Sequence, residues 1–321
     1  MGNLHPYRIA IIAPTCFYYQ VELFRKLNDH PEIDLTVCFC SKEALDTKEV
    51  QQMYNTDSGW GIESELLEGY KYKFLRNYSP QPSYLKWPFG LINFGILKWI
   101  IQSRPDAVIL MSWMNPTWWM ALATCVVFRI PFFYMTDANV QIEPLRSKWK
   151  RRIKRMVLGR LLFKLSSGFL CAGTANNHFY KMYGVPDNKL FPFAYSWGYD
   201  SLSKISEELK PQRDELRSEF GIPGKSLVIL YCGRLSAEKN LFHLVDSHHR
   251  LDHDGKSLIF VGDGELRQSL QTNVDQLGAE SVYFLGFQNR NQIAKCYTIA
   301  DVLVLPSVRE TWGIVVNEAM C

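Results

Sequence analysis

The chain has 321 residues, of which 47% are hydrophobic and 21% are charged, and its formal net charge is +4. This length and composition predict a soluble globular protein of about two domains. A net charge this small does not by itself indicate a nucleic-acid partner.

Short apolar segments alternate with helical patterns through the first half of the chain. Residues 17–30 are predicted to form a helix, because Val21, Phe24 and Leu27 lie at helical spacing. Asn115 is the expected N-cap of a later helix. Strands are predicted at 8–13, 33–40, 106–111, 131–136 and 168–173. This repetition predicts a doubly wound α/β fold, an open parallel sheet wrapped by helices.

A polar segment with two prolines, residues 196–225, interrupts the pattern, and we expect a hinge or linker there. A second series of strands follows within SLVILYCGRL, SLIFVGDGEL, VYFLGF and DVLVLPS. The sequence therefore predicts two Rossmann-like domains that face a cleft, an N-terminal one over 1–195 and a C-terminal one over 226–321. Ligands of such sheets bind at the carboxyl ends of the strands.

The eight cysteines are scattered and mostly lie in apolar segments, which predicts reduced, buried thiols and a cytosolic chain. Cys38 and Cys40 are one residue apart, but no second pair follows to complete a zinc site. The chain shows no export signal. Its most apolar segment, 118–128, is too short to cross a bilayer.

Two cations follow the first predicted strand of the second half. Arg234 and Lys239 suit a diphosphate, because arginine can bond two oxygens at once while lysine neutralises a point charge, although loop cations also often simply face water. Gly262 and Gly264 follow the next strand. They indicate either a tight turn or a place where a nucleotide approaches the backbone.

Two carboxylates lie on either side of the start of a predicted helix in the stretch ETWGIVVNEAMC. Glu310 precedes the helix, which begins near Gly313, and Glu318 lies inside it. The N–H groups at the start of a helix favour an anion. Carboxylates accept hydrogen bonds and suit hydroxyl-rich partners such as ribose and hexose. The alternative is an amphipathic helix with a solvated glutamate.

The segments GRLSAEKN, FVGDGELR, YFLGF, ADVLVLPS and ETWGIVVNEAM occur in the order, and at about the spacing, seen in retaining glycosyltransferases of family 4, which have the GT-B fold. The chain resembles this family well over 226–320 and loosely over 1–195. The resemblance implies that Glu310, the first Glu of an E-x7-E motif, contacts the transferred sugar, and that Glu318 holds the ribose hydroxyls.

The same resemblance assigns the remaining donor contacts. Arg234 and Lys239 are expected to hold the donor diphosphate, assisted by N–H groups around Gly313 and Ile314. Phe287 lies in the segment that looks like the one beside the base, and Gly262 in the turn that a nucleotide would approach. The resemblance implies no essential metal and no cofactor other than the nucleotide-sugar substrate.

The first half departs from the family pattern. The chain has APTCFYYQ where many members carry a glycine-rich loop, and Asp137 where the family often has a histidine. Under this alignment Asp137 faces the acceptor or the donor hexose, and an Asp that caps a turn is the alternative. Trp113 follows another strand and is an acceptor-side candidate for stacking on a sugar, or else a core residue.

Nine Lys or Arg and no acid lie from Arg146 to Lys164. Since the net charge of the whole chain is +4, the net charge of the rest of the chain is −5. Apolar residues at helical spacing share this segment, a pattern typical of helices that lie on anionic membranes. The apolar side could instead pack on its own sheet, and no motif accompanies the charge to indicate nucleic acid. The membrane-contact candidates are Trp149, Arg151, Arg152, Ile153, Lys154 and Arg155.

Together these features predict a cytoplasmic enzyme, peripheral on the inner face of the membrane, that transfers a sugar with retention from a nucleotide-sugar to a glycan or lipid-linked acceptor. Cell-surface polysaccharide or glycolipid biosynthesis is the expected context. A GT-B nucleotide-sugar epimerase and a catalytically silent membrane-associated scaffold are the alternatives. Relatives continue beyond the position of Cys321 with further strands and helices, so we expect a fragment with an incomplete second domain.

Overall fold

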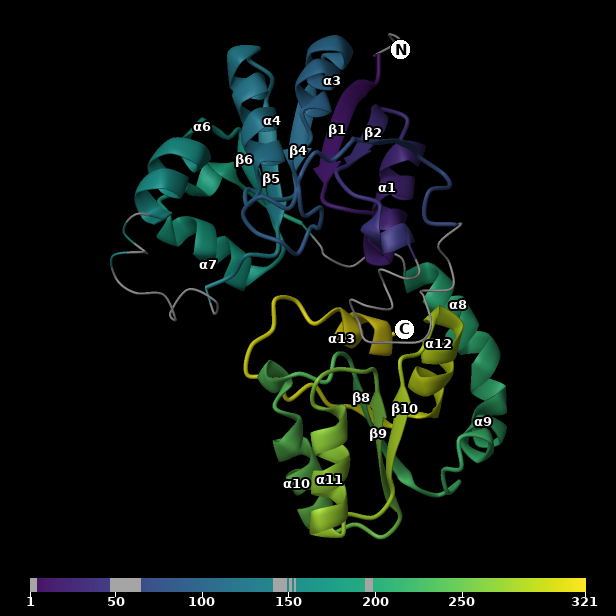
Figure 1. The fold of residues 1–321 in the computed structure, drawn as a ribbon. Coiled ribbons are helices and arrows are strands. Elements are labelled where there is room, and N and C mark those ends of the chain that lie inside the picture. The colour runs from purple at the N-terminus through teal and green to yellow at the C-terminus, as the bar shows by residue number, and fades with distance from the viewer. Residues whose placement is uncertain (1–4, 47–64, 141–148, 150–151, 153, 194–198) are drawn as a thin grey trace. The chain divides into compact units, whose positions relative to one another are not determined.

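The computed structural model describes residues 5–46, 65–140, 149, 152, 154–193 and 199–321. Their contacts divide the described chain into two compact units, residues 5–46 with 65–193 and residues 199–321. Each unit has its own parallel sheet with helices packed against it (Figure 1). The two units are described separately below.

The first unit contains a seven-stranded parallel sheet in the order β3-β2-β1-β4-β5-β6-β7. The central strands are buried and apolar, as a sheet covered on both faces requires. The two edge strands, β3 and β7, were not predicted, because they are short and largely exposed. The strands are β1 (Tyr7–Ala13), β2 (Ile33–Phe39), β3 (Lys71–Phe74), β4 (Ala107–Leu110), β5 (Phe132–Thr136), β6 (Gly168–Cys171) and β7 (Leu190–Pro192).

One large core lies between this sheet and α3, α4, η3 and α7, where Ile96, Trp118, Leu162 and Phe179 are buried. Figure 1 shows α3 and α4 side by side, with α1 beside β1 and β2. The helical elements are α1 (Tyr18–Asp29), η1 (Glu43–Leu45), α3 (Gly95–Ser103), α4 (Pro116–Val127), the π-helix η3 (Arg155–Leu162), α6 (Phe163–Leu165), α7 (Thr174–Met182) and η4 (Asp187–Lys189).

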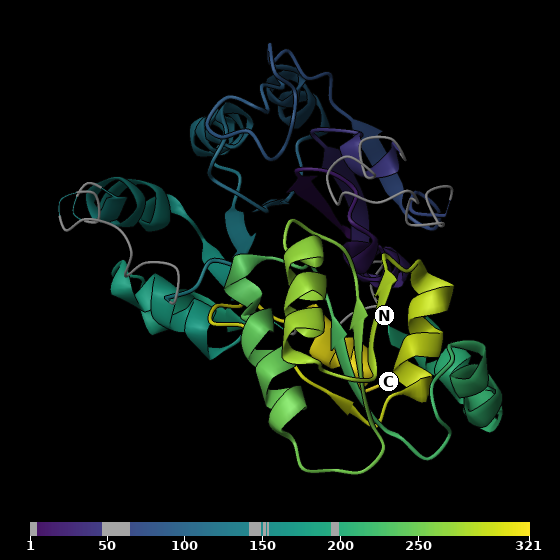
Figure 2. The same cartoon turned by 60° about the horizontal axis from the view of Figure 1, so that its bottom comes forward.

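The second unit contains a four-stranded parallel sheet in the order β10-β9-β8-β11. Alternate residues of its central strands face two cores: Tyr231 and Phe260 face α10 and α11, whereas Leu230 and Ile259 face α9 and α12. Figures 1 and 2 show the helices on the two faces of this sheet. The elements are β8 (Leu227–Cys232), η6 (Ala237–Lys239), α10 (Leu241–Arg250), β9 (Lys256–Val261), α11 (Arg267–Leu277), β10 (Val282–Gly286), α12 (Arg290–Ile299), β11 (Val302–Leu303) and α13 (Ile314–Ala319).

The expected linker, 196–225, is helical over most of its described part. It forms α8 (Tyr199–Leu209), η5 (Lys210–Gln212) and α9 (Arg213–Glu219). Leu202 and Leu216 are buried, and Arg217, 5% exposed, donates to the Ile299 carbonyl at 2.9 Å. Its apolar residues have helical spacing, and the described part of the segment packs with the second unit. A hinge or linker role for 196–225 stays a prediction.

Within the described ranges, no helix is long and apolar enough to cross a membrane. All eight cysteines are free thiols and seven are buried, as predicted. Burial raises the pKa of the Cys16 thiol to about 11, so these side chains behave as core residues.

Candidate functional site

The candidate donor-site residues of the second unit follow strands that lie side by side. In the order β10-β9-β8-β11, the chain runs outward from β8 through β9 to β10 and then returns to place β11 on the other side of β8. Open α/β sheets bind ligands beside the carboxyl ends of strands at such a reversal. The loop after β8 carries Arg234 and Lys239, and the loop after β11 carries Glu310. Gly262 follows β9 and Phe287, partly buried, follows β10. The sheet thus brings residues from four sequence motifs to one edge.

The loops after β8 and β11 are joined by an ion pair. Lys239 Nζ lies 2.6 Å from Glu310 Oε2, with the two side chains 17% and 27% exposed. Ser307 Oγ donates to the same carboxylate oxygen at 3.2 Å. The main-chain N–H of Val308 donates to the Glu238 carbonyl at 2.9 Å. Glu310 is therefore held in place by residues of both loops.

Arg234 lies in the same β8 loop but is more accessible. Its side chain is 56% exposed, and its Nε is 3.8 Å from Glu265 Oε2. The hydroxyl of buried Tyr231 donates to the Arg234 carbonyl at 2.8 Å, which fixes the main chain while leaving the guanidinium near solvent. An accessible guanidinium on a fixed loop suits an anionic ligand.

Close packing of the main chain explains why residue 262 is a glycine. Its φ is +125°, and a Cβ at this position would lie 2.0 Å from the Gly233 carbonyl oxygen. The Gly262 N–H donates to the Gly286 carbonyl at 2.7 Å, while Leu235 N–H donates to the Asp263 carbonyl at 2.9 Å. The glycine is thus required where the loops after β8, β9 and β10 meet. The tight-turn interpretation accounts for it, and a nucleotide contact stays a prediction.

Glu310 and Glu318 have different surroundings. Glu318 lies inside α13 and is 7% exposed, and the Tyr297 hydroxyl donates to its Oε2 at 2.7 Å. Burial, together with the charge of Glu318, raises the pKa of Tyr297, so the phenol stays protonated and can donate. The alternative of a solvated glutamate in this helix is wrong.

Gly313 is the N-cap of α13 with a φ of +75°, and Ile314 is the first helical residue, as the sequence predicted. An anion site here would depend on individual main-chain N–H groups, and the assignment of Gly313 and Ile314 to the donor stays a prediction.

Trp113, in the first unit, packs into the core. Its ring stacks on Phe179 with centroids 6.1 Å apart and an interplanar angle of 4°. It also meets Tyr134 and Phe163 edge-on, at 5.8 Å and 5.5 Å. The core interpretation of Trp113 accounts for these contacts, because the residue is partly buried and packs against the core of the first unit. Stacking of Trp113 on a sugar stays a prediction. Asp137 directly follows β5 and is partly open to solvent, but desolvation by surrounding atoms raises the pKa of its carboxyl; its role stays a prediction.

Of the membrane-contact candidates, Arg151 and Ile153 lie outside the described residues. Trp149 is 62% exposed, and the nearby Arg152 and Arg155 are exposed. Lys154 instead turns inward, with Nζ 5.2 Å from the Phe179 ring centroid. The π-helix buries Leu158 and Leu162 in the core, and Val157 also packs against it, whereas Met156 is exposed.

Residues 212–321 match the family model of glycosyl transferases group 1. An uncharacterised glycosyltransferase of Methanocaldococcus jannaschii is 31% identical over 144 residues, 43% of this chain and 36% of the relative. The sulfoquinovosyl transferase of Arabidopsis thaliana is 28% identical over 245 residues, 75% of this chain and 46% of the relative. The chain thus spans less than half the length of these two relatives.

Solved structures show the same fold at low sequence identity. The crystal structure of Anabaena HepE in complex with UDP has a TM-score of 0.69 and 17% identity, with 98% of this chain and 78% of that chain covered. WaaG, a glycosyltransferase involved in lipopolysaccharide biosynthesis, has a TM-score of 0.57 and 15% identity, with 97% and 78% covered. The GT-B fold expected from the sequence is therefore shown.

Two residues at the site were missed by sequence reasoning. Ser307 lies three positions before Glu310, so local spacing could have indicated its hydrogen bond. Tyr297 lies 21 positions before Glu318, on a different helix, and no sequence pattern connects the two. Only the packing of α12 beside α13 brings the phenol to the carboxylate.

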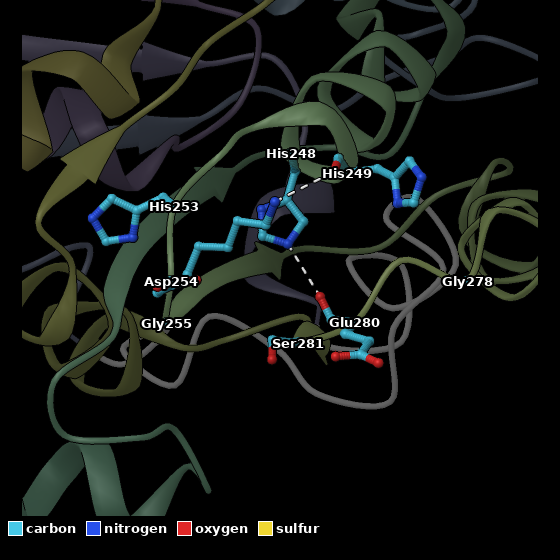
Figure 3. A pocket seen from close by; sticks show the side chains of 9 residues that line it. His248, His249, His253, Asp254, Gly255, Gly278, Glu280 and Ser281 are labelled. Carbon is cyan, nitrogen blue, oxygen red and sulfur yellow. Dashed lines mark hydrogen bonds between the residues drawn. The ribbon is translucent and has the colours of Figure 1, made fainter.

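A polar pocket lies at the opposite, amino edge of the same sheet. Figure 3 shows His248 at its centre, and the His248 Nε2 lies 3.2 Å from the Glu280 carbonyl oxygen. Burial lowers the pKa of His248, which favours the neutral ring. His249 and His253 also line the pocket, but no group of three or more metal-ligating side chains is found among the described residues. The pocket is separate from the candidate donor site.

Proposed function

We propose that this chain belongs to a retaining glycosyltransferase of family 4, which transfers a sugar from a nucleotide-sugar donor to a glycan or lipid-linked acceptor. The observation that carries the proposal is the meeting of Lys239 and Glu310 at the reversal point of the second sheet. The proposal is supported by this pairing of a cation, which suits a phosphate, with a carboxylate, which suits a sugar, on loops at the carboxyl ends of strands, where such folds bind ligands. The UDP complex of Anabaena HepE supports a nucleotide-sugar as donor.

In the proposed reaction the bond between the anomeric carbon and the donor phosphate oxygen breaks, and the acceptor hydroxyl bonds to the same face of that carbon. Arg234 and Lys239 stabilise the negative charge that develops on the leaving diphosphate. The leaving phosphate takes the proton of the acceptor hydroxyl, so no separate base is needed. Glu310 orients the sugar and stabilises its positive character, and Glu318 binds the ribose hydroxyls.

Glu310 Oε2 already accepts bonds from Lys239 and Ser307. The donor phosphate would compete with Glu310 for the ammonium group of Lys239. The negative charge of Glu310 would then be less neutralised by Lys239 and could interact with the sugar. Asp137 is proposed to contact the acceptor, and Phe287 to lie beside the base. The proposal requires no metal.

We also propose that the exposed side of the segment around Trp149 contacts an anionic membrane surface, with Arg152 and Arg155 supplying positive charge. Such contact would bring the enzyme to a lipid-linked acceptor. A cytoplasmic location, peripheral on the inner face of the membrane, is part of this proposal.

Nucleotide binding tests the donor proposal first. In a thermal-shift panel of nucleoside diphosphates and their sugars, one base should raise the Tm by roughly 5 °C or more at saturating ligand. No stabilisation by any member of the panel would contradict the proposal. Incubating the stabilising donor without an acceptor separates the alternatives, because a nucleotide-sugar epimerase would form an epimer and a transferase would not.

The Glu310→Gln variant then tests the catalytic role. Transfer should fall by roughly a hundredfold or more, while nucleoside diphosphate affinity stays within about threefold of the wild type, because the lost charge acts on the sugar. Glu219→Gln, on the exposed α9–α12 contact, is the matched control and should retain activity. Loss of diphosphate binding in Glu310→Gln would show that its role is misassigned.

A further inference from the structure

The loop between β3 and α3, residues 75–94, exposes an unusual set of large apolar side chains. Trp87 is 66% exposed, Phe89 63% and Leu85 62%, and Phe94 and Tyr78 are about half exposed. Water contact with this much aromatic surface is unfavourable, and contiguous apolar patches on soluble proteins commonly mark interaction sites. We call Tyr78, Leu85, Trp87, Phe89 and Phe94 the aromatic loop set.

Hydrogen bonds to buried and partly buried polar side chains fix the main chain of this loop. Asn77 Nδ2 donates to the Gly90 carbonyl at 2.8 Å, and its Oδ1 accepts from the Ile92 N–H at 2.9 Å. Glu43, which is buried, accepts from the Tyr84 N–H at 2.7 Å. The polar groups of the loop are thus satisfied on the inside, and its apolar side chains are left to point outward.

The base of the loop is fixed to the sheet and to α4. Asn93 is fully buried and donates to the carbonyls of Cys40 and Leu75 at 2.9 Å and 3.0 Å. Thr117 Oγ1 donates to Asn93 Oδ1 at 2.8 Å, and the Asn115 side chain accepts from Leu91 N–H at 3.3 Å instead of capping its own helix. The exposure of the aromatic loop set is therefore built into the fold.

Topology places the loop beside other exposed apolar residues. The loop leaves the carboxyl end of β3, and α4 begins at the same edge of the sheet, where Met114 and Trp119 are 47% and 39% exposed. The segment carrying Trp149, 62% exposed, also begins at this edge, after β5. The loop after β3, the start of α4 and the residues after β5 thus all leave the carboxyl edge of one sheet.

The charge of residues 69–105 indicates which kind of partner fits the exposed apolar residues of the loop. Residues 69–105 contain six Lys or Arg and no acid. Arg76 and Lys86 are exposed beside the aromatic residues, and Arg152 and Arg155 are exposed near Trp149. Glu43, which accepts from the Tyr84 N–H, is buried under the loop, whereas Asp46, after β2, and Asp137, after β5, are exposed acids at the same edge of the sheet.

We propose that the aromatic loop set is an interfacial anchor that inserts into an anionic lipid bilayer. Tryptophan and phenylalanine are favoured at the boundary of headgroups and acyl chains, and neighbouring cations are attracted to anionic headgroups. The anchor is distinct from the segment around Trp149 and requires no transferase activity. A second copy of this chain is the competing occupant of the same surface.

Vesicle co-sedimentation tests the anchor. The protein should bind vesicles of phosphatidylcholine that contain about 30% phosphatidylglycerol more tightly than vesicles of phosphatidylcholine alone. Trp87→Ala/Phe89→Ala should weaken binding at least about tenfold, and Leu85→Ser/Phe89→Ser should do the same with Trp87 intact. Tyr7→Ala/Val127→Ala is the matched control, since it removes exposed apolar groups at the amino edge of the same sheet and should bind as the wild type does.

The salt dependence of vesicle binding distinguishes the aromatic loop set from the cations near Trp149. Arg152→Gln/Arg155→Gln should reduce the part of binding that falls as salt rises, whereas the loop variants should reduce the part that survives at high salt. Unchanged vesicle binding in both loop variants, with circular dichroism showing that they are folded, would overturn the proposal. So would a wild type that binds no vesicles but forms dimers which Trp87→Ala/Phe89→Ala dissociates in light scattering.

Discussion

Lys239 Nζ and Glu310 Oε2 are 2.6 Å apart, although the two residues are separated by 71 positions and belong to different loops. Each has an exposed fraction below a third, so solvent screens their attraction less than at an open surface. The pair couples the cation proposed for the diphosphate to the carboxylate proposed for the sugar. A ligand that engages one residue therefore changes the electrostatic surroundings of the other.

Removing the cation should weaken binding of the leaving group. We expect Lys239→Met to lower nucleoside diphosphate affinity by about tenfold to a hundredfold, because a charge-assisted hydrogen bond is lost. Isothermal titration with the stabilising nucleoside diphosphate measures this. Lys225→Met, an exposed lysine of the same unit, should bind normally. Equal affinities for wild type and Lys239→Met would remove Lys239 from the donor site.

Tyr297 should position Glu318 through its hydroxyl. Tyr297→Phe deletes a 2.7 Å hydrogen bond to a buried carboxylate, so we expect the free energy of unfolding to fall by about 1–3 kcal/mol. If Glu318 binds the ribose, nucleotide affinity should fall as well. Urea unfolding and titration measure the two effects. Tyr283→Phe, whose hydroxyl donates at 3.3 Å to the Gly221 carbonyl near the surface, should change neither by much.

Gly262 should not accept a side chain. A Cβ would lie 2.0 Å from the Gly233 carbonyl oxygen, so Gly262→Ala must displace the loop after β8. We expect a loss of about 3 kcal/mol or more in the free energy of unfolding. Thermal unfolding compares it with Gly224→Ala, where a Cβ meets nothing within 4 Å and φ is not positive. A Gly262→Ala protein as stable as the wild type contradicts this packing.

Asp301 should make the second unit sensitive to acid. Burial by itself would raise the pKa of this carboxyl, but hydrogen bonds from the Val228 N–H and Arg213, with the charge of Arg217, lower it below its ordinary value of 3.8. A lowered folded-state pKa contributes stability that is present above pH 3.8 and lost as pH falls through the folded pKa. Asp301→Asn should reduce stability at pH 7 and flatten its decline below pH 4, a difference that urea midpoints measured across pH would reveal.

Local sequence patterns predicted much of the fold. The strands at β1, β2, β4, β5 and β6 were predicted within a few residues, since buried parallel strands are continuous apolar segments. A helix that begins near Gly313 was predicted too. Edge strands β3 and β7 and the helices α8 and α9 were not, because their short or polar sequences carry a weaker apolar signal.

The sequence by itself determined which residue types stand at the carboxyl ends of the strands, because strand periodicity and the motif order are local properties of the chain. Only the tertiary structure decided their partners: Lys239 with Glu310, Tyr297 with Glu318, and a glycine where three loops meet. It also turned Trp113 inward and left Trp87 exposed. These outcomes depend on the order of strands in the sheet and on helix packing. Both bring together residues that are far apart in the chain, and neither produces a periodic pattern in the sequence.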